Sequence, residues 1–262
     1  MTDDLTFVAV CAGILALVLA LAGLILPEST PITSFPYGNL TGVPQSFPYG
    51  NLTGVPNVQL EHGLVLWLPL NDGIGNASDF SGCLNHGLIS GALWVDGKYG
   101  KALSFNGSTD YVSVLHSASF DVSNITISLW MKFDTVPAEY TRIVSKSGYI
   151  FELLLQSDQK IWGRIIVDDL WRSSPTSSVL VVGIWYHVVL IYDGSYVRLY
   201  VNSVEVTPAT AYSGAVGSDA SSVLIGCKDG VIKWFDGVID DVRVYNRVLS
   251  QDEITALYNL PV

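Results

Sequence analysis

The sequence predicts an all-β protein: a two-sheet antiparallel sandwich with one short helix near its C-terminus. Runs of β-branched and aromatic residues, such as 127–133 and 187–192, alternate with Asp-Gly, Asn-Gly or Ser-Gly turns. Only one segment of the C-terminal three-quarters has a good helix start, because Ser250 and Glu253 can form a capping box. A helix over residues 251–259 is therefore expected.

The N-terminal segment predicts a membrane helix. After a short tail, residues 1–4, residues 5–26 contain no charged or strongly polar side chain, and at 1.5 Å per residue they span roughly 33 Å. The tail has no Lys or Arg and the apolar run continues beyond the small residues at 20–22, so an uncleaved anchor is favoured over a cleaved signal peptide. Small residues at 12, 16 and 20 favour self-association, although Ala is common in apolar helices. A homo-oligomer is expected.

Residues 27–59 predict an extended stalk. The eleven-letter phrase at 34–44 recurs without change at 46–56, and each copy contains two Pro and two Gly, which exclude a helix or a central strand. The repeat has a weak similarity to repeats of tail-fibre proteins, which implies a trimeric shaft. A duplicated linker without a partner remains the alternative.

Residues 60–262 are long enough to bury their own core. They resemble the laminin-G-like, or concanavalin A-like, jelly-roll family in an ordered series of phrases. These phrases are Gly63 to Asn71, Asp79 to Gly87, Gly100 to Gly107, Trp185 to Val189, Tyr192 to Gly194, Leu199 to Asn202 and Phe235 to Arg247. The resemblance implies a jelly-roll sandwich. It leaves function open, because this fold occurs in lectins, adhesion modules, glycosidases and structural subunits.

Charge and glycosylation motifs indicate an exported surface protein. The net charge is −11, and no Lys or Arg precedes Lys98, which argues against nucleic acid or anionic lipid headgroups as partners. Five N-x-Ser/Thr sequons are candidate glycosylation sites and are compatible with an extracellular sandwich on a cell or virion surface. They begin at Asn39, Asn51, Asn76, Asn106 and Asn124.

The sequence predicts no enzyme. Retaining glycosidases of the jelly-roll superfamily need two neighbouring carboxyl groups on one strand. Here the Glu residues of the sandwich are single, and the doublets Asp168-Asp169 and Asp240-Asp241 would point to opposite faces of a strand. There is also no Gly-x-Ser-x-Gly motif, and the four His lack metal-ligand spacing.

The best cofactor candidate is a structural calcium ion. The turn from Asp79 to Asn85 is rich in oxygen ligands. The resemblance implies a calcium site near the chain ends, held by Asp79, Asn85 and Asp241, with Asp240 as the less favoured alternative to Asp241. An Asx-turn that satisfies its own backbone is the competing interpretation.

The three Cys allow one disulfide in the sandwich. Cys11 lies in the apolar N-terminal segment, which leaves Cys83 and Cys227 as the candidate pair. Two free thiols are the alternative.

Two Trp residues are candidates for recognition. Trp162 and Trp171 lie among charged residues and are expected to form an open ligand-binding face with Arg164, Asp168 and Arg172. By contrast, Trp67, Trp94, Trp130 and Trp185 are expected in the core.

Two function classes follow. The first is a membrane-anchored, non-catalytic surface protein with a lectin-like sandwich that binds a glycan or a surface protein. The second is a structural subunit of a virion spike or extracellular filament, which oligomerises through the anchor and the stalk.

Overall fold

The computed structural model describes residues 59–146, 150–230 and 232–261. The predicted anchor and the stalk repeats lie outside the described residues, so both stay predictions. Within the described residues, no helix is long and apolar enough to cross a membrane.

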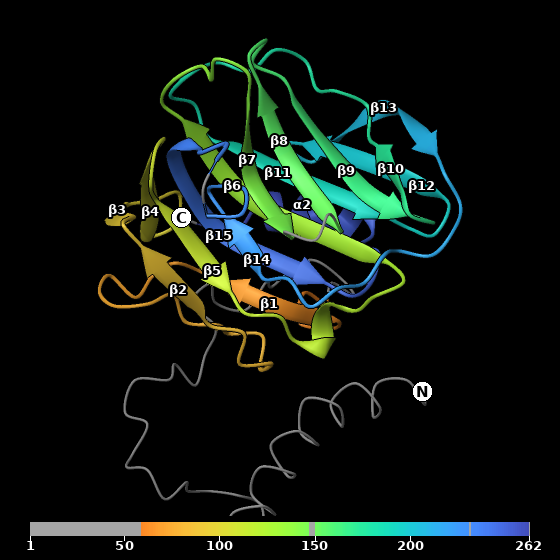
Figure 1. Ribbon diagram of the computed structural model, residues 1–262, viewed down its shortest axis with the longest axis horizontal. Coiled ribbons are helices and arrows are strands. Elements are labelled where there is room, and N and C mark those ends of the chain that lie inside the picture. Colours follow the sequence, from red (N-terminus) through yellow and green to blue (C-terminus); the bar gives the residue numbers. More distant parts are fainter. Residues whose placement is uncertain (1–58, 147–149, 231, 262) are drawn as a thin grey trace, which may run out of the picture. The chain divides into compact units, whose positions relative to one another are not determined.

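Two antiparallel sheets confirm the predicted sandwich (Figure 1). In the first sheet the order is β13-β12-β11-β6-β15-β4-β3, with β1 also paired to β15. Its strands are β1 (Leu64–Leu68), β3 (Leu93–Asp96), β4 (Lys101–Asn106), β6 (Ile125–Phe133), β11 (Tyr186–Tyr192), β12 (Tyr196–Val201), β13 (Val204–Ala211) and β15 (Asp236–Tyr245).

The second sheet has the order β10-β9-β8-β7-β14-β5-β2. Its strands are β2 (Gly87–Ser90), β5 (Tyr111–Val114), β7 (Tyr140–Lys146), β8 (Phe151–Gln156), β9 (Ile161–Val167), β10 (Leu170–Ser173) and β14 (Val223–Ile225). Apolar side chains of the two inner faces fill the space between the sheets. At Gly163 an added Cβ would lie 2.3 Å from the Leu190 side chain, so only glycine allows β9 to pack this closely on β11.

The helix α2 (Gln251–Tyr258) begins with the predicted capping box between Ser250 and Glu253. It packs on the outer face of the first sheet, where Tyr258 stacks on Trp130 with ring centroids 5.6 Å apart. A short 3₁₀ helix, η1 (Ala118–Phe120), connects the two sheets between β5 and β6.

The sandwich has two distinct ends. Pairing of Leu64 with Tyr245 places the start of β1 beside the end of β15, and Arg247 donates to the Gln59 carbonyl at 2.9 Å. We call this the entry end, because the chain enters the sandwich here. The opposite end, at the top of Figure 1, carries the β6–β7 and β8–β9 loops.

The sandwich is complete by itself. The described residues from 59 to 260 belong to one compact unit, and every strand named above pairs with another strand of that unit. Each strand of both sheets thus has its pairing partner among the described residues of that unit.

Candidate functional site

The outer face of the second sheet carries two of the predicted Trp residues. Along β9, Ile161, Gly163 and Ile165 are buried toward the other sheet, while Trp162 and Arg164 alternate with them and are half-buried on the outer face. Trp171 on β10 pairs with Ile166 of β9 and lies on the same face. Period-two alternation therefore brings both indoles and one guanidinium to one surface.

Glu152 organises the charges of this face. It lies opposite Arg164 in the β8–β9 register and is only 2% exposed. Its carboxylate accepts hydrogen bonds from Arg142 Nε at 2.6 Å and from Arg164 Nε at 2.5 Å. A buried carboxylate is tolerated when such charge-assisted bonds replace water, and Glu152 here holds two guanidinium groups in place.

The Arg164 guanidinium connects the carboxylate to both indoles. Its central carbon lies 4.1 Å from the Trp171 ring centroid and 5.5 Å from that of Trp162. We call Trp162, Arg164 and Trp171 the tryptophan patch. Because Glu152 fixes the guanidinium, the patch is arranged before any ligand arrives.

Asp168 and Arg172 do not belong to this patch, and their predicted place in it is wrong. Asp168 lies in the β9–β10 turn, where its carboxylate accepts a hydrogen bond from the Ala215 N–H at 3.0 Å. Arg172 pairs with inward-facing Ile165 and lies over the Tyr212 ring at 4.8 Å. The two side chains therefore hold loops together.

The predicted core Trp residues divide into two groups. Trp67 and Trp130 are buried as expected. Trp94 and Trp185 are half-buried, so the expectation for them is wrong. Trp94 lies on β3, the edge strand of the first sheet, and Trp185 lies just before the start of β11.

A cleft of about 450 Å³ opens at the end opposite the entry end. Tyr140 and Trp234 are the aromatic residues of its lining. Polar groups surround them from the β4–β5, β6–β7 and β14–β15 loops. The lining residues with polar side chains are Asn106, Thr135, Glu139, Thr141, Lys233 and Asp236.

Charges in the cleft are ordered around Tyr140. Lys233 forms an ion pair with Glu139, which lowers the pKa of that carboxyl group, and lies 4.2 Å from the Tyr140 ring centroid. The Arg142 guanidinium lies 5.4 Å from the same centroid. Since Arg142 also binds Glu152, a continuous series of charged and aromatic groups connects the cleft with the tryptophan patch.

The charged neighbours of two aromatic residues in the sequence could have indicated this cleft. Trp234 lies between Lys233 and Asp236, the same kind of charged surroundings that indicated Trp162 and Trp171. Tyr140 follows Glu139 in the same way.

The predicted calcium ligands do not fit a calcium site. Asp79 accepts four hydrogen bonds, from Trp67, Asn85 and twice from Ser81, at 2.8 to 2.9 Å. This is the Asx-turn that the sequence left as the alternative. Asp241 forms an ion pair with Arg243 at 3.0 Å, and a guanidinium at this distance opposes a divalent cation. Asn85 directs its amide nitrogen to the Val65 carbonyl at 2.7 Å.

The carboxylate of Asp240, the alternative calcium ligand, is also hydrogen-bonded within the protein. It accepts hydrogen bonds from the backbone N–H groups of Tyr99 and Asp241. Across the described ranges, no three His, Cys, Asp or Glu side chains form a group that could hold a metal ion.

The predicted disulfide is not formed. Cys227 is a buried free thiol just after β14, and burial raises its pKa to about 11. Cys83 is half-buried in the Asx-turn region.

Three of the sequons lie on described residues. Asn76 and Asn106 are exposed, and Asn124 is half-buried. Asn39 and Asn51 lie outside the described residues, and glycosylation at all five positions stays a prediction.

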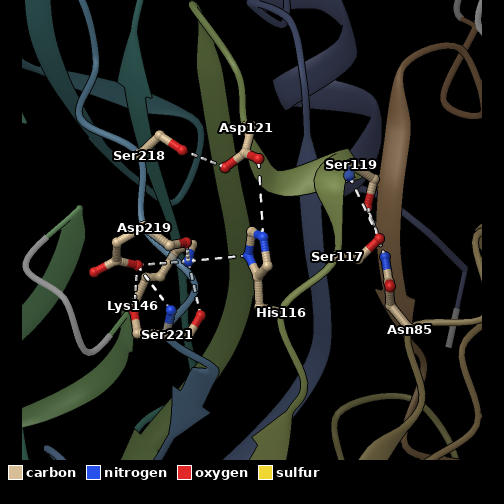
Figure 2. Close-up of polar contacts among 9 residues, drawn as sticks. All are labelled: Asn85, His116, Ser117, Ser119, Asp121, Lys146, Ser218, Asp219 and Ser221. Atoms are coloured by element: carbon tan, nitrogen blue, oxygen red, sulfur yellow. Dashed lines mark hydrogen bonds and ion pairs between the residues drawn. The ribbon is translucent and has the colours of Figure 1, made fainter.

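Figure 2 shows a polar cluster at the entry end. Lys146 is fully buried and donates to Asp219 and to the Ser221 carbonyl, at 2.7 to 2.8 Å. Ser218 donates to Asp121 at 2.7 Å, while Asp121 lies 3.8 Å from His116. Because the serine contacts the carboxylate and not the imidazole, this is not the arrangement of a catalytic triad. The cluster closes the end of the core.

A family model described as the concanavalin A-like lectin/glucanases superfamily matches residues 106–255. The chain belongs to this superfamily. The match covers the outer-face strands β7 to β10 and all three loops that line the cleft. Among curated proteins, none matches the sequence.

Solved structures support the same fold. The binding domain of Paraclostridial Mosquitocidal Protein 1 is 19% identical with a TM-score of 0.65, over 77% of this chain and 53% of that domain. Domain 4 of AbnA, an extracellular arabinanase of Geobacillus stearothermophilus solved with arabinotriose, is 21% identical with a TM-score of 0.62, over 75% of this chain and 98% of the other. A Trypanosoma rangeli sialidase mutant is 17% identical with a TM-score of 0.59, over 75% and 32%. The chain thus spans about half of the mosquitocidal binding domain.

Proposed function

We propose that this chain is a non-catalytic surface protein, anchored through residues 5–26, whose sandwich binds carbohydrate in the cleft. The observation that carries the proposal is the cleft itself, where Tyr140 and Trp234 combine with hydrogen-bonding side chains in a concave volume of ligand size. Aromatic faces pack on the apolar faces of sugar rings, and carboxylates and amides accept or donate to hydroxyl groups.

The position of the cleft favours a display function. The chain enters the sandwich at the entry end, and the cleft opens at the opposite end. A ligand in the cleft would therefore bind far from the point of attachment, as adhesion to another surface requires. The arabinotriose named with the AbnA domain belongs to a sandwich of the same fold and is consistent with a sugar ligand here.

The carboxyl groups favour binding over hydrolysis. A glycosidase needs a general acid whose pKa is raised, whereas Lys233 lowers the pKa of Glu139 in the cleft. Glu152, on the adjoining face, is held between two guanidinium groups.

A glycan array with residues 59–262 tests the proposal. We expect Trp234→Ala, Tyr140→Ala and Glu139→Gln each to weaken the affinity for the best glycan at least about tenfold, or about 1.4 kcal/mol. Trp94→Ala, a half-buried Trp outside the cleft, is the matched control and should bind normally. Melting curves confirm that each variant is folded. Unchanged binding in all three cleft variants would refute the proposal.

A second candidate function is the structural subunit of a surface assembly. The tryptophan patch favours it, because Trp and Arg dominate protein interfaces and the patch is already ordered by Glu152. Mass photometry of the full chain in detergent separates the two functions. Trp171→Ala should reduce oligomers in an assembly subunit, whereas the cleft variants should leave them intact.

A further inference from the structure

The segment between β10 and β11 carries an exposed aliphatic cluster. Val179, Val181, Val182 and Ile184 have between 39 and 59% of their surface exposed. We call residues 179–184 the apolar loop. Soluble proteins usually expose apolar side chains singly, so a concentration of this kind marks a contact surface.

The surroundings of the apolar loop are uncharged along the chain. No Asp, Glu, Lys or Arg occurs between Arg172 and Asp193. The loop can therefore enter an apolar medium without removing a formal charge of its own segment from water.

The backbone of the apolar loop is largely satisfied within the protein. This matters because an N–H group without a partner is costly in hydrocarbon. Four of its N–H groups donate hydrogen bonds to protein acceptors: Leu180 to the Gln159 carbonyl, Val181 to the Tyr186 hydroxyl, Gly183 to the Phe133 carbonyl, and Ile184 to the Val181 carbonyl.

Aromatic residues follow directly at the base of the loop. Trp185 and Tyr186 are half-buried, and Lys132 lies 5.5 Å from a Trp185 ring centroid. Trp and Tyr are enriched where a protein crosses from water into lipid, and Lys is suited to the headgroup level. An aliphatic tip above an aromatic base has the order of groups found across a bilayer interface.

We propose that the apolar loop inserts shallowly into the surface of a zwitterionic lipid bilayer. A protein partner is less well matched, because Val and Leu are under-represented among residues that dominate protein interfaces. A strongly anionic bilayer is also less well matched, because the chain carries a net charge of −11.

The loop lies at the same end of the sandwich as the cleft. Gly183 bonds to Phe133, the last residue of β6, and the β6–β7 loop that follows contributes exposed Val136 to the cleft wall. Insertion would bring the cleft to the membrane surface.

Flotation of residues 59–262 with phosphatidylcholine vesicles tests the proposal. We expect weak, reversible binding with a partition coefficient no greater than about 10⁴ M⁻¹, the value for a single acyl chain. The fluorescence emission of Trp185 should shift to shorter wavelength on binding, because its indole would move into a less polar environment. Adding phosphatidylserine should weaken binding at low salt.

Matched variants test whether the apolar loop is the part of the chain that binds the vesicles. Val181→Asp combined with Val182→Asp should lower the partition coefficient at least about tenfold. Leu115→Asp, at a position that is 65% exposed in the segment between β5 and η1, should bind like the parent. Flotation that is absent in the parent, or equal in all three proteins, would overturn the proposal. A soluble dimer that the double variant disperses, without vesicle binding, would show a self-interface and would also overturn it.

Discussion

Glu152 and Arg164 face each other across β8 and β9 and form an ion pair at 2.5 Å, although they are twelve residues apart in the chain. The same carboxylate binds Arg142, which is 1% exposed. One buried carboxylate therefore bridges two guanidinium groups, a buried one on Arg142 and one on Arg164 that lies against the tryptophan rings. The arrangement of the tryptophan patch depends on this carboxylate.

Glu152→Gln should destabilise the fold by roughly 3 to 5 kcal/mol, because the buried Arg142 charge would lose its partner. Urea unfolding measures this loss. Glu205→Gln is the control: Glu205 pairs with Arg198 in a partly exposed position, and its loss should cost about 1 kcal/mol or less. Similar losses in the two variants would show that burial does not govern the Glu152 contribution.

The loss of stability on Trp→Ala substitution should be larger for a buried Trp than for a half-buried one. Trp130→Ala should cost roughly 3 to 5 kcal/mol, because the ring is 3% exposed and stacks on Tyr258. Trp162→Ala and Trp171→Ala should each cost only about 1 kcal/mol, since both rings are half-buried on an outer face. Chemical denaturation gives all three values. A loss of more than about 3 kcal/mol at Trp171 would place that ring in the core.

Asp240 should make stability depend on pH. Burial raises its pKa to about 8, so the folded chain binds this proton more tightly than the unfolded chain, whose Asp pKa is about 3.9. This contribution to stability is fully present below about pH 4 and is lost as the pH rises toward about 8.

The difference in stability between the parent and Asp240→Asn isolates this effect from other titrating groups. Between pH 5 and pH 8.5, the parent should lose at least about 1.4 kcal/mol relative to the variant, the equivalent of one pKa unit. A difference that does not change with pH would mean that Asp240 is ionised throughout.

Residues 59–262 should fold without the preceding chain, because both sheets are complete within the compact unit. Circular dichroism should show mostly strand with little helix, and unfolding should be cooperative. A segment that becomes soluble only when residues 27–58 are added would show that the stalk supplies part of the fold.

Local and periodic features were predictable from the sequence. The capping box at Ser250 and Glu253 forms as expected, because its two hydrogen bonds join residues three positions apart. The outward positions of Trp162 and Arg164 follow from alternation along one strand.

Other features depended on contacts between distant segments. Glu152 was one of several single Glu residues in the sequence, and only the register of β7, β8 and β9 places it between two Arg. Proximity in sequence predicts that Arg172 belongs to the patch, but strand pairing turns its side chain to the other face. Asp79 and Asp241 have the carboxylates that calcium prefers. In the folded chain, however, Asp79 accepts hydrogen bonds from its own turn and Asp241 pairs with Arg243.

The fold class, the position of the one α-helix in the described residues and the choice of Trp162 as an outward residue follow from the sequence, because strands, caps and charged neighbours depend on residues close together in the chain. The cleft, the exposure of the apolar loop and the position of Glu152 between two Arg residues arise from the packing of distant segments. The cleft is built from three loops that are separated by up to about 130 residues, and exposure of the apolar loop depends on what packs beside it. Such features arise only when the two sheets pack, since no local pattern specifies which distant loops meet.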